Sequence, residues 1–214
     1  MHKLNSTNLK DLGEVANLQM LSFVNSLTTK LGKSYIEKSL QWFLAKPNRF
    51  LFHIYDGEKV VGFCGGFAPQ FYGDGSTSGM IQFAFSEAIL GIVKNPFLLF
   101  NSELRKHYPL ILRNIKKKIG LIKSTAIKGP NQSSPASFEK YIGLVVIGVH
   151  PQNRGTGVFE MLMNEFEHRA SAFDCKKCIL SVKSNNSRAF SAYKKMGWQV
   201  QNEMDGIFTL VKFI

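Results

Sequence analysis

The stretch that decides the fold is HPQNRGTGVFEML, residues 150–162. The residues before it, GLVVIGV (143–149), form an unbroken apolar run that predicts a buried strand, and residues 155 to about 172 have the apolar spacing of a helix. Glycines between a strand and a helix free backbone N–H groups at the helix N-terminus to meet an anion, usually a phosphate. Arg154 adds a cation at the same place. The alternative is a glycine-rich turn that only packs the helix on the strand.

Two familiar phosphate-binding loops are excluded by the residues that follow the glycines. A P-loop requires Gly-Lys-Ser/Thr, whereas Phe159 and Glu160 stand in the first turn of the helix here. The dinucleotide fingerprint requires a third glycine, and Glu160 occupies that position. The remaining pattern fits a pyrophosphate bound without a lysine or a magnesium ion, such as the pyrophosphate of coenzyme A.

A second motif follows in NSRAFSAYKKMGW (186–198). Asn186, Ala189, Tyr193 and Gly197 recur in helical steps, so they are expected on one side of a helix. The small residues let a ligand lie close, Asn186 offers an amide and Tyr193 offers a hydroxyl. The alternative is an ordinary amphipathic helix in which Tyr193 belongs to the core.

Together the two motifs resemble those of the GNAT N-acetyltransferase superfamily. VHPQNRGTG resembles its Q/R-x-x-G-x-G/A motif, and NSRAFSAYKKMGW resembles its N-x-x-A-x-x-x-Y-x-x-x-G-[FW] motif. The resemblance also covers the N-terminal helices and the DGEKVVGF hairpin. It implies one α/β domain over residues 1–214, with a central mixed β-sheet flanked by helices. Residues 71–140 are then a basic, helical insertion between the third and fourth strands.

The resemblance also implies a role for individual residues. The backbone of Ile147, Gly148 and Val149 would pair with the pantetheine arm of acetyl-CoA, with the Val149 N–H facing the thioester oxygen. The pyrophosphate would be held by the N–H groups of Arg154, Gly155, Thr156, Gly157 and Val158. Asn186 would contact the cofactor arm, and Tyr193 would also bind the cofactor and protonate its leaving sulfur as the catalytic acid. The general base stays open, because Gly143 stands where some relatives carry a glutamate; Glu139, Tyr141, His53 and a relay of waters are the alternatives.

Elsewhere the sequence predicts alternating helices and strands. Thr7 or Asn8 is expected to cap a first helix with Asp11 in its first turn. The other expected elements are a helix at 33–45, antiparallel strands at 50–55 and 59–67 around Asp56-Gly57, strands at 141–149 and 178–182, a helix at 186–196, and strands at 198–201 and 207–213 around Asp205-Gly206.

The insertion 71–140 differs in character from the rest. YGDGSTSG (72–79) is typical of a loop, Asn95 and Pro96 predict a helix start, and Tyr108, Leu112, Ile115, Ile119 and Ile122 form an apolar stripe. With ten Lys or Arg and four Asp or Glu, the insertion holds half of the chain's positive excess. We favour packing on the sheet or on a second subunit, or a lid over the acceptor site, above contact with an anionic membrane surface.

Net charge and cysteine content indicate which partners, metal sites and cellular compartment to expect. The net charge of +12 favours anionic partners. No nucleic-acid-binding motif is present, so nucleic acid is not expected as a partner. Three cysteines, including a lone Cys175-x-x-Cys178 pair, favour a reducing compartment and no metal site. The sequence shows no apolar run of membrane-spanning length and no apolar signal core, so we expect a cytoplasmic monomer or homodimer.

The function expected from these features is an acetyl-CoA-dependent N-acetyltransferase acting on the amine of a small molecule. Similarity to family members with an insertion at this place suggests an amino sugar or nucleotide-linked amino sugar as the acceptor, by association alone. The alternative is a non-catalytic acetyl-CoA-binding module, or a basic module that associates with nucleic acid or membrane.

Overall fold

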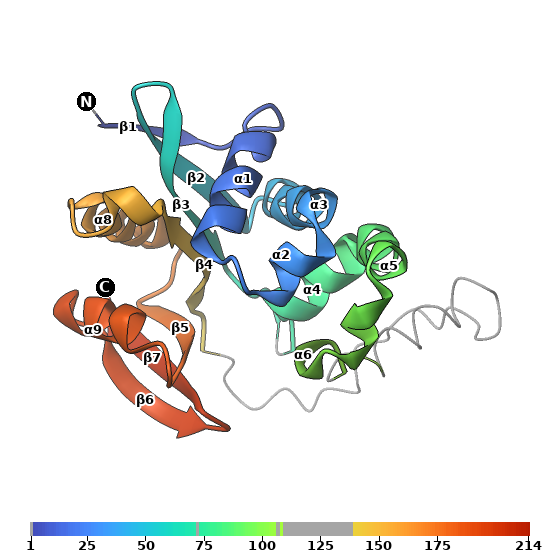
Figure 1. Cartoon of the computed structure of the whole chain (residues 1–214). Helices are drawn as coiled ribbons and strands as arrows, with labels where there is room; N and C mark the ends of the chain where they lie inside the picture. The colour runs from blue at the N-terminus through green and yellow to red at the C-terminus, as the bar shows by residue number, and fades with distance from the viewer. Residues whose placement is uncertain (1, 72, 106–107, 109–138) are drawn as a thin grey trace.

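The computed structural model describes residues 2–71, 73–105, 108 and 139–214. Its centre is a seven-stranded sheet in the order β1-β2-β3-β4-β5-β7-β6 (Figure 1). All neighbouring strands are antiparallel except β4 and β5, which are parallel, so the sheet is mixed as predicted. The strands are β1 (His2–Ser6), β2 (Arg49–Asp56), β3 (Lys59–Phe67), β4 (Ile142–Val149), β5 (Lys177–Lys183), β6 (Gln199–Met204) and β7 (Ile207–Phe213).

Helices cover both faces of this sheet. One face carries α8 and α9, whose apolar side chains form a core with β2, β3, β4, β5 and β7 around Phe52, Phe166 and Trp198. The other face carries α1 and α3, which bury Phe43 and Phe63 in a second core. The described helices are α1 (Leu12–Ser22), α2 (Leu27–Leu31), α3 (Lys33–Leu44), α4 (Ser76–Phe83), α5 (Phe85–Lys94), η1 (Pro96–Phe100), α6 (Ser102–Arg105), η2 (Pro151–Asn153), α8 (Val158–Ser171) and α9 (Ser187–Lys195).

Both predicted hairpins are confirmed. The turn between β6 and β7 has positive φ at both central residues, 52° at Asp205 and 72° at Gly206, which is the geometry of a type I′ turn. Gly57, in the turn between β2 and β3, has a φ of 60°. Asp56 pairs with Lys59 at the end of β2, so the centre of that turn is Gly57 and Glu58 and not the predicted Asp56-Gly57 pair.

The N-terminal expectations were partly wrong. Residues 2–6 form strand β1, which pairs with β2 and was not predicted. Helix α1 begins at Leu12, so Asp11 is its N-cap residue and does not lie in the first turn. Thr7 cannot act as the cap because its Oγ1 is hydrogen-bonded to Nδ1 of His53 at 2.8 Å. Asn8 instead lies in the preceding turn, where its N–H donates to Asp11 Oδ2.

The described part of the insertion is helical, but its elements differ from those expected. Residues 76–79, expected in a loop, open α4. The helix expected from Asn95 is the 3₁₀ helix η1, which ends at the extended residue Asn101 before α6 begins. This break lets Leu98 and Leu104 both reach a third apolar cluster with α3 and α5. The predicted stripe from Leu112 to Ile122 lies outside the described residues.

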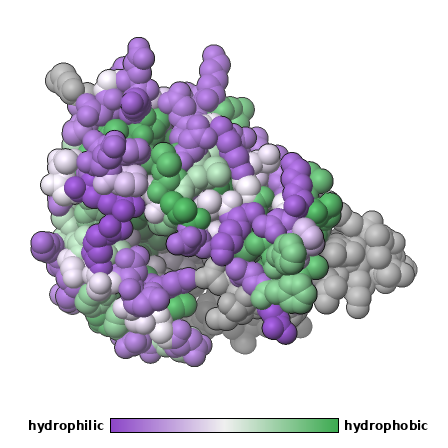
Figure 2. Space-filling model, viewed as in Figure 1, coloured by the Kyte–Doolittle hydropathy of each residue, from purple (hydrophilic) through white to green (hydrophobic). Residues whose placement is uncertain are grey.

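Apolar side chains gather on the surface of α5 and η1, on the right in Figure 2. Phe97 and Phe100 are 80% and 81% exposed, and Leu90, Val93 and Leu99 are also exposed. Within the described ranges, no single helix has both the length and the apolarity to cross a membrane; α4 and α5 meet that test only when joined, across a bend of 69°.

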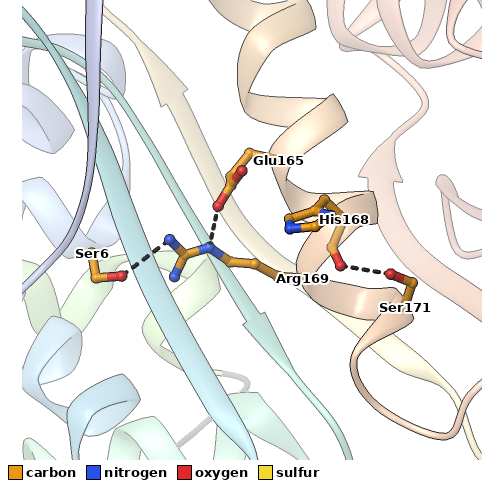
Figure 3. A network of polar contacts seen from close by, with 5 residues as sticks. All are labelled: Ser6, Glu165, His168, Arg169 and Ser171. Atoms are coloured by element: carbon orange, nitrogen blue, oxygen red, sulfur yellow. Dashed lines mark hydrogen bonds and ion pairs between the residues drawn. The ribbon is translucent and has the colours of Figure 1, made fainter.

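Arg169 fastens α8 to the edge of the sheet (Figure 3). Its Nε donates to Glu165 Oε1 at 2.6 Å, its Nη2 donates to Ser6 Oγ at 3.0 Å, and its guanidinium lies 4.7 Å from the centre of the Phe52 ring. The same side chain therefore joins α8, β1 and β2. These contacts hold the C-terminal end of α8, the helix that begins at the glycine loop.

Candidate functional site

Strands β4 and β5 separate in the middle of the sheet. They pair only from Ile142 to Leu144 on β4 and from Cys178 to Leu180 on β5. Beyond that point β4 continues to Val149 and β5 continues to Lys183, but the two strands no longer pair with each other. In Figure 1, β5, β6, β7 and α9 accordingly form a lower group that turns away from β1 to β4. The result is an unpaired edge on each of the two strands, with an opening in the backbone pairing between them.

A β-bulge in β4 marks the start of this opening. The register between β3 and β4 passes from Gly65 opposite Val146 to Gly66 opposite Leu144, so Val145 is the extra residue. At the other end, the N–H of His150 donates to the Val61 carbonyl of β3. Backbone N–H and C=O groups of successive residues point to alternate edges of a strand. The N–H and C=O groups of Val149 and Ile147 therefore point toward the opening. Gly148 turns toward β3.

The glycine loop lies where the unpaired edge ends. Gly155 and Gly157 have φ values of 81° and 89°, in the left-handed region that favours glycine. A Cβ added at either would meet no atom within 4 Å, so the space in front of them is open. Helix α8 therefore begins at Val158 and not at Gly155, and its N-cap, Gly157, has no side chain to bond the first N–H groups. Those N–H groups remain available to an anion.

Two arginines and α1 meet at the same loop. Arg154 Nη2 donates to the Ser22 carbonyl at 3.4 Å, and Ser22 Oγ donates to the Val149 carbonyl at 3.3 Å, so the end of α1 is tied to the loop and to β4. Burial lowers the pKa of Arg154, and the nearby charge of Arg188 lowers it further. Arg188 lies in the first turn of α9 and was not predicted as a site residue. An anion between these two cations would relieve their repulsion.

The other loop residues are placed as follows. Thr156 donates through Oγ1 to the Asn153 carbonyl at 2.8 Å, which closes the turn. Val158 is fully buried, and a Cβ added at Gly62 of β3 would lie 2.8 Å from Val158 Cγ1. Gly62 thus lets α8 sit close to the sheet directly behind the loop.

Asn186 and Tyr193 both lie on α9 but in different surroundings. Asn186 is the N-cap, where its Oδ1 accepts from the Ala189 N–H at 3.3 Å. Tyr193 is only 6% exposed and packs edge-on against Phe159, in the first turn of α8, and against Trp198. Burial raises the pKa of Tyr193, with a smaller contribution from Cys64, so its phenol stays protonated at neutral pH. Gly197, with a φ of 84°, lies beyond the last helical residue and ends α9.

The structure places the three candidate side chains for the general base in different surroundings. Glu139 is ion-paired with Lys177 at 2.7 Å. His53, on β2, is fully buried and hydrogen-bonded to Thr7, and burial lowers its pKa. Tyr141 lies in a pocket of about 410 Å³ lined by Phe67, Asp74, Gly75, Ser76, Thr77, Ser78, Ile81, Tyr141 and Gly143. Asp74 was missed from the sequence because it stands in a Gly- and Ser-rich stretch, although it is one of few acidic residues in a basic insertion.

The cysteines and possible metal ligands add no further site. Cys64 and Cys178 are buried, Cys175 is half-buried, and all three are free thiols. Among the residues that the structure describes, no three His, Cys, Asp or Glu side chains lie close enough together to hold a metal ion.

Comparison with known proteins agrees with this geometry. Residues 93–198, about half of the chain, match the model of the acetyltransferase (GNAT) family. A curated relative, Acetyltransferase SG1711 of Sodalis glossinidius, is 33% identical over 58 residues, which are 27% of this chain and 41% of that protein. The chain thus matches well under half the length of this relative.

Solved acetyltransferases share the whole fold at low identity. The PaiA N-acetyltransferase of Thermoplasma acidophilum, in complex with coenzyme A, has a TM-score of 0.57 at 11% identity, over 100% of this chain and 99% of that one. NAA60 of Arabidopsis thaliana, in complex with acetyl-CoA, has a TM-score of 0.54 at 15% identity over 100% and 99%. The aminoglycoside 6′-N-acetyltransferase of Acinetobacter baumannii has a TM-score of 0.56 at 10% identity over 95% of each chain. With the family-model match and this fold, the chain belongs to the GNAT acetyltransferase family.

Proposed function

We propose that this chain is an acetyl-CoA-dependent N-acetyltransferase that acts on the amine of a small molecule. The observation that supports this most strongly is the unpaired edge of β4 from Val145 to Val149, which leads directly into the glycine loop. An unpaired strand edge accepts an extended chain as an added strand. The pantetheine arm is an extended chain with two amides, and its attached pyrophosphate would then fall at the start of α8.

The residues at the loop fit a pyrophosphate in three respects. The space in front of Gly155 and Gly157 is open, the first N–H groups of α8 have no side-chain cap, and Arg154 and Arg188 bring two positive charges together. In this arrangement the N–H groups from Arg154 to Val158 hold the phosphates. Val149 and Ile147 bind the arm through their backbone groups. Asn186 orients α9, and thereby Tyr193, through its cap.

Acetyl-CoA, when bound, supplies an activated acyl group as a thioester. The chain has to orient it, donate a hydrogen bond to the thioester oxygen, and provide a proton for the sulfur that leaves. Because the arm runs from the pyrophosphate at α8 back along β4, its thioester lies near the bulge at Val145, so a backbone N–H at the bulge serves as the donor in place of the Val149 N–H expected from the sequence. Tyr193, whose phenol is protonated at neutral pH, passes its Oη proton to the sulfur. The acceptor amine loses its own proton to water or to a group in the pocket beside Gly143.

The test is a calorimetric titration with acetyl-CoA, followed by an assay of free thiol release with a panel of amines. Selective acetyl-CoA binding with amine-dependent thiol release supports the proposal. Binding without thiol release from any amine would favour a non-catalytic acetyl-CoA-binding module, to which the packing of Tyr193 between Phe159 and Trp198 would also be suited.

Among acceptors, an amino sugar or nucleotide-linked amino sugar was expected from the sequence. Likeness of fold does not select an acceptor, because one fold carries many specificities. The acceptor has to be argued from the pocket itself.

A further inference from the structure

The pocket beside Gly143 adjoins the end of the unpaired β4 edge at which the proposed cofactor arm would place its acyl group. Gly143 and Leu144 immediately precede the bulge at Val145, where β4 leaves β5. If the cofactor arm follows β4 from Val149 back toward the bulge, its acyl end stops next to Gly143. The pocket is then the space directly ahead of the acyl group. Its volume, about 410 Å³, lies in the range of small-molecule sites.

The lining of this pocket has the opposite charge to the phosphate loop. Its described lining residues include one carboxylate, Asp74, and the hydroxyls of Ser76, Thr77, Ser78 and Tyr141, but no Lys, Arg or His. The loop at the other end of β4 carries Arg154, with Arg188 nearby. In a chain of net charge +12, an acidic pocket at the acyl end is a local departure that favours cations and disfavours phosphates.

One carboxylate oxygen of Asp74 is held by a backbone hydrogen bond, and the other can still accept a hydrogen bond. Its Oδ2 accepts from the Gln70 N–H at 3.0 Å, while its Oδ1 accepts from no residue in the described part of the chain. The charge of Asp74 acts on Arg49, but the Arg49 side chain is bound to Trp42. Arg49 Nη1 donates to the Trp42 carbonyl at 2.9 Å, and its guanidinium lies 3.5 Å from the centre of the Trp42 ring. The Asp74 carboxylate is therefore available to an ammonium group.

We propose that Asp74 anchors the acceptor, and that the acceptor is a small, phosphate-free amine with a second positive charge. This proposal rests on the proposed function. The second ammonium group binds Asp74, the hydroxyls of Ser76 to Ser78 surround the chain between the two nitrogens, and the free amine meets the acyl group beside Gly143. A nucleotide-linked amino sugar, which brings two phosphates, does not suit this pocket.

The experiment compares three amines in the thiol-release assay: 1,4-diaminobutane, 1-aminobutane and glucosamine 6-phosphate. The wild-type protein should have its highest kcat/KM with the diamine and its lowest with the phosphorylated amine. Asp74→Asn should raise the KM for the diamine about tenfold or more, because a charge-assisted hydrogen bond is lost. The same substitution should leave the KM for the monoamine unchanged. Asp74→Glu should restore part of the preference. Glu58→Gln, an exposed change in the turn between β2 and β3, is the matched control.

Calorimetric titration with acetyl-CoA accompanies every variant and separates the two proposals. If the wild-type protein does not bind acetyl-CoA, the proposed function is contradicted. Retained binding with a preference for glucosamine 6-phosphate, or with a diamine preference that Asp74→Asn leaves unchanged, overturns the acceptor proposal alone. If none of the amines is turned over, binding of 1,4-diaminobutane in the presence of coenzyme A decides: binding that Asp74→Asn abolishes supports the proposal, and equal or absent binding overturns it.

Discussion

Gly157→Ala tests whether the glycine loop binds phosphate or is only a turn. Gly157 has a φ of 89°, and an added Cβ would meet no protein atom within 4 Å, so the substitution brings no clash within the protein. It does impose the strain of a left-handed conformation on an L residue, about 1–2 kcal/mol. It also places a methyl group in the space that the phosphates would occupy. The variant should therefore lose both some stability and cofactor affinity.

Gly57→Ala is the matched control for the strain. Gly57 also has a positive φ, 60°, and open space around its Cβ, but it lies in the turn between β2 and β3. Both variants should lower the free energy of unfolding by about 1–2 kcal/mol in urea titrations. Only Gly157→Ala should raise the acetyl-CoA Kd, by about tenfold or more, because one or two hydrogen bonds to a charged group are lost or lengthened. Equal Kd values in the two variants would refute the phosphate assignment.

Three further predictions concern single residues. Tyr193→Phe should lower kcat by about a hundredfold while leaving the acetyl-CoA Kd nearly unchanged; if single-turnover rates are unaffected, Tyr193 is not the acid. His53 should make the protein less stable in acid. Burial lowers its folded-state pKa below the ordinary 6.5, against smaller opposing effects of Asp11 and Glu14, so the unfolded state binds the proton more tightly and stability falls as the pH drops below 6.5. Urea unfolding at pH 7.5 and 5.5 should show this loss, and His53→Gln should show a smaller one; an equal loss would assign it to other groups. Arg169→Ala should lower the free energy of unfolding by about 1–2 kcal/mol, because two hydrogen bonds and a cation–π contact are lost; a change below about 0.3 kcal/mol would show that the contacts in Figure 3 add nothing.

Much of the sheet could be predicted because its signals are local. The turn at Asp205-Gly206 and the turn that follows Asp56 at Gly57 define two hairpins by backbone conformation, and the apolar run before His150 defines β4. By contrast, β1 is a short, mixed sequence that becomes a strand only by pairing with β2. Its formation depends on a partner far along the chain, which no local pattern records.

The candidate site divides in the same way. The glycine loop was visible because its positive φ values require particular residues. The separation of β4 from β5 was not visible, since it arises from the bulge at Val145 and from the register of three strands. Asp74 lines the pocket beside Gly143 only because the chain after β3 folds back beside the start of β4, which no local sequence pattern indicates.

The most direct test of the central claim is a calorimetric titration of the wild-type protein with acetyl-CoA, with adenosine 3′,5′-bisphosphate as the comparison. The account predicts that acetyl-CoA binds clearly more tightly, because the unpaired edge of β4 holds the pantetheine arm in addition to the phosphates at α8. Equal affinity for the two ligands, or binding of neither, would contradict a cofactor site between β4 and β5.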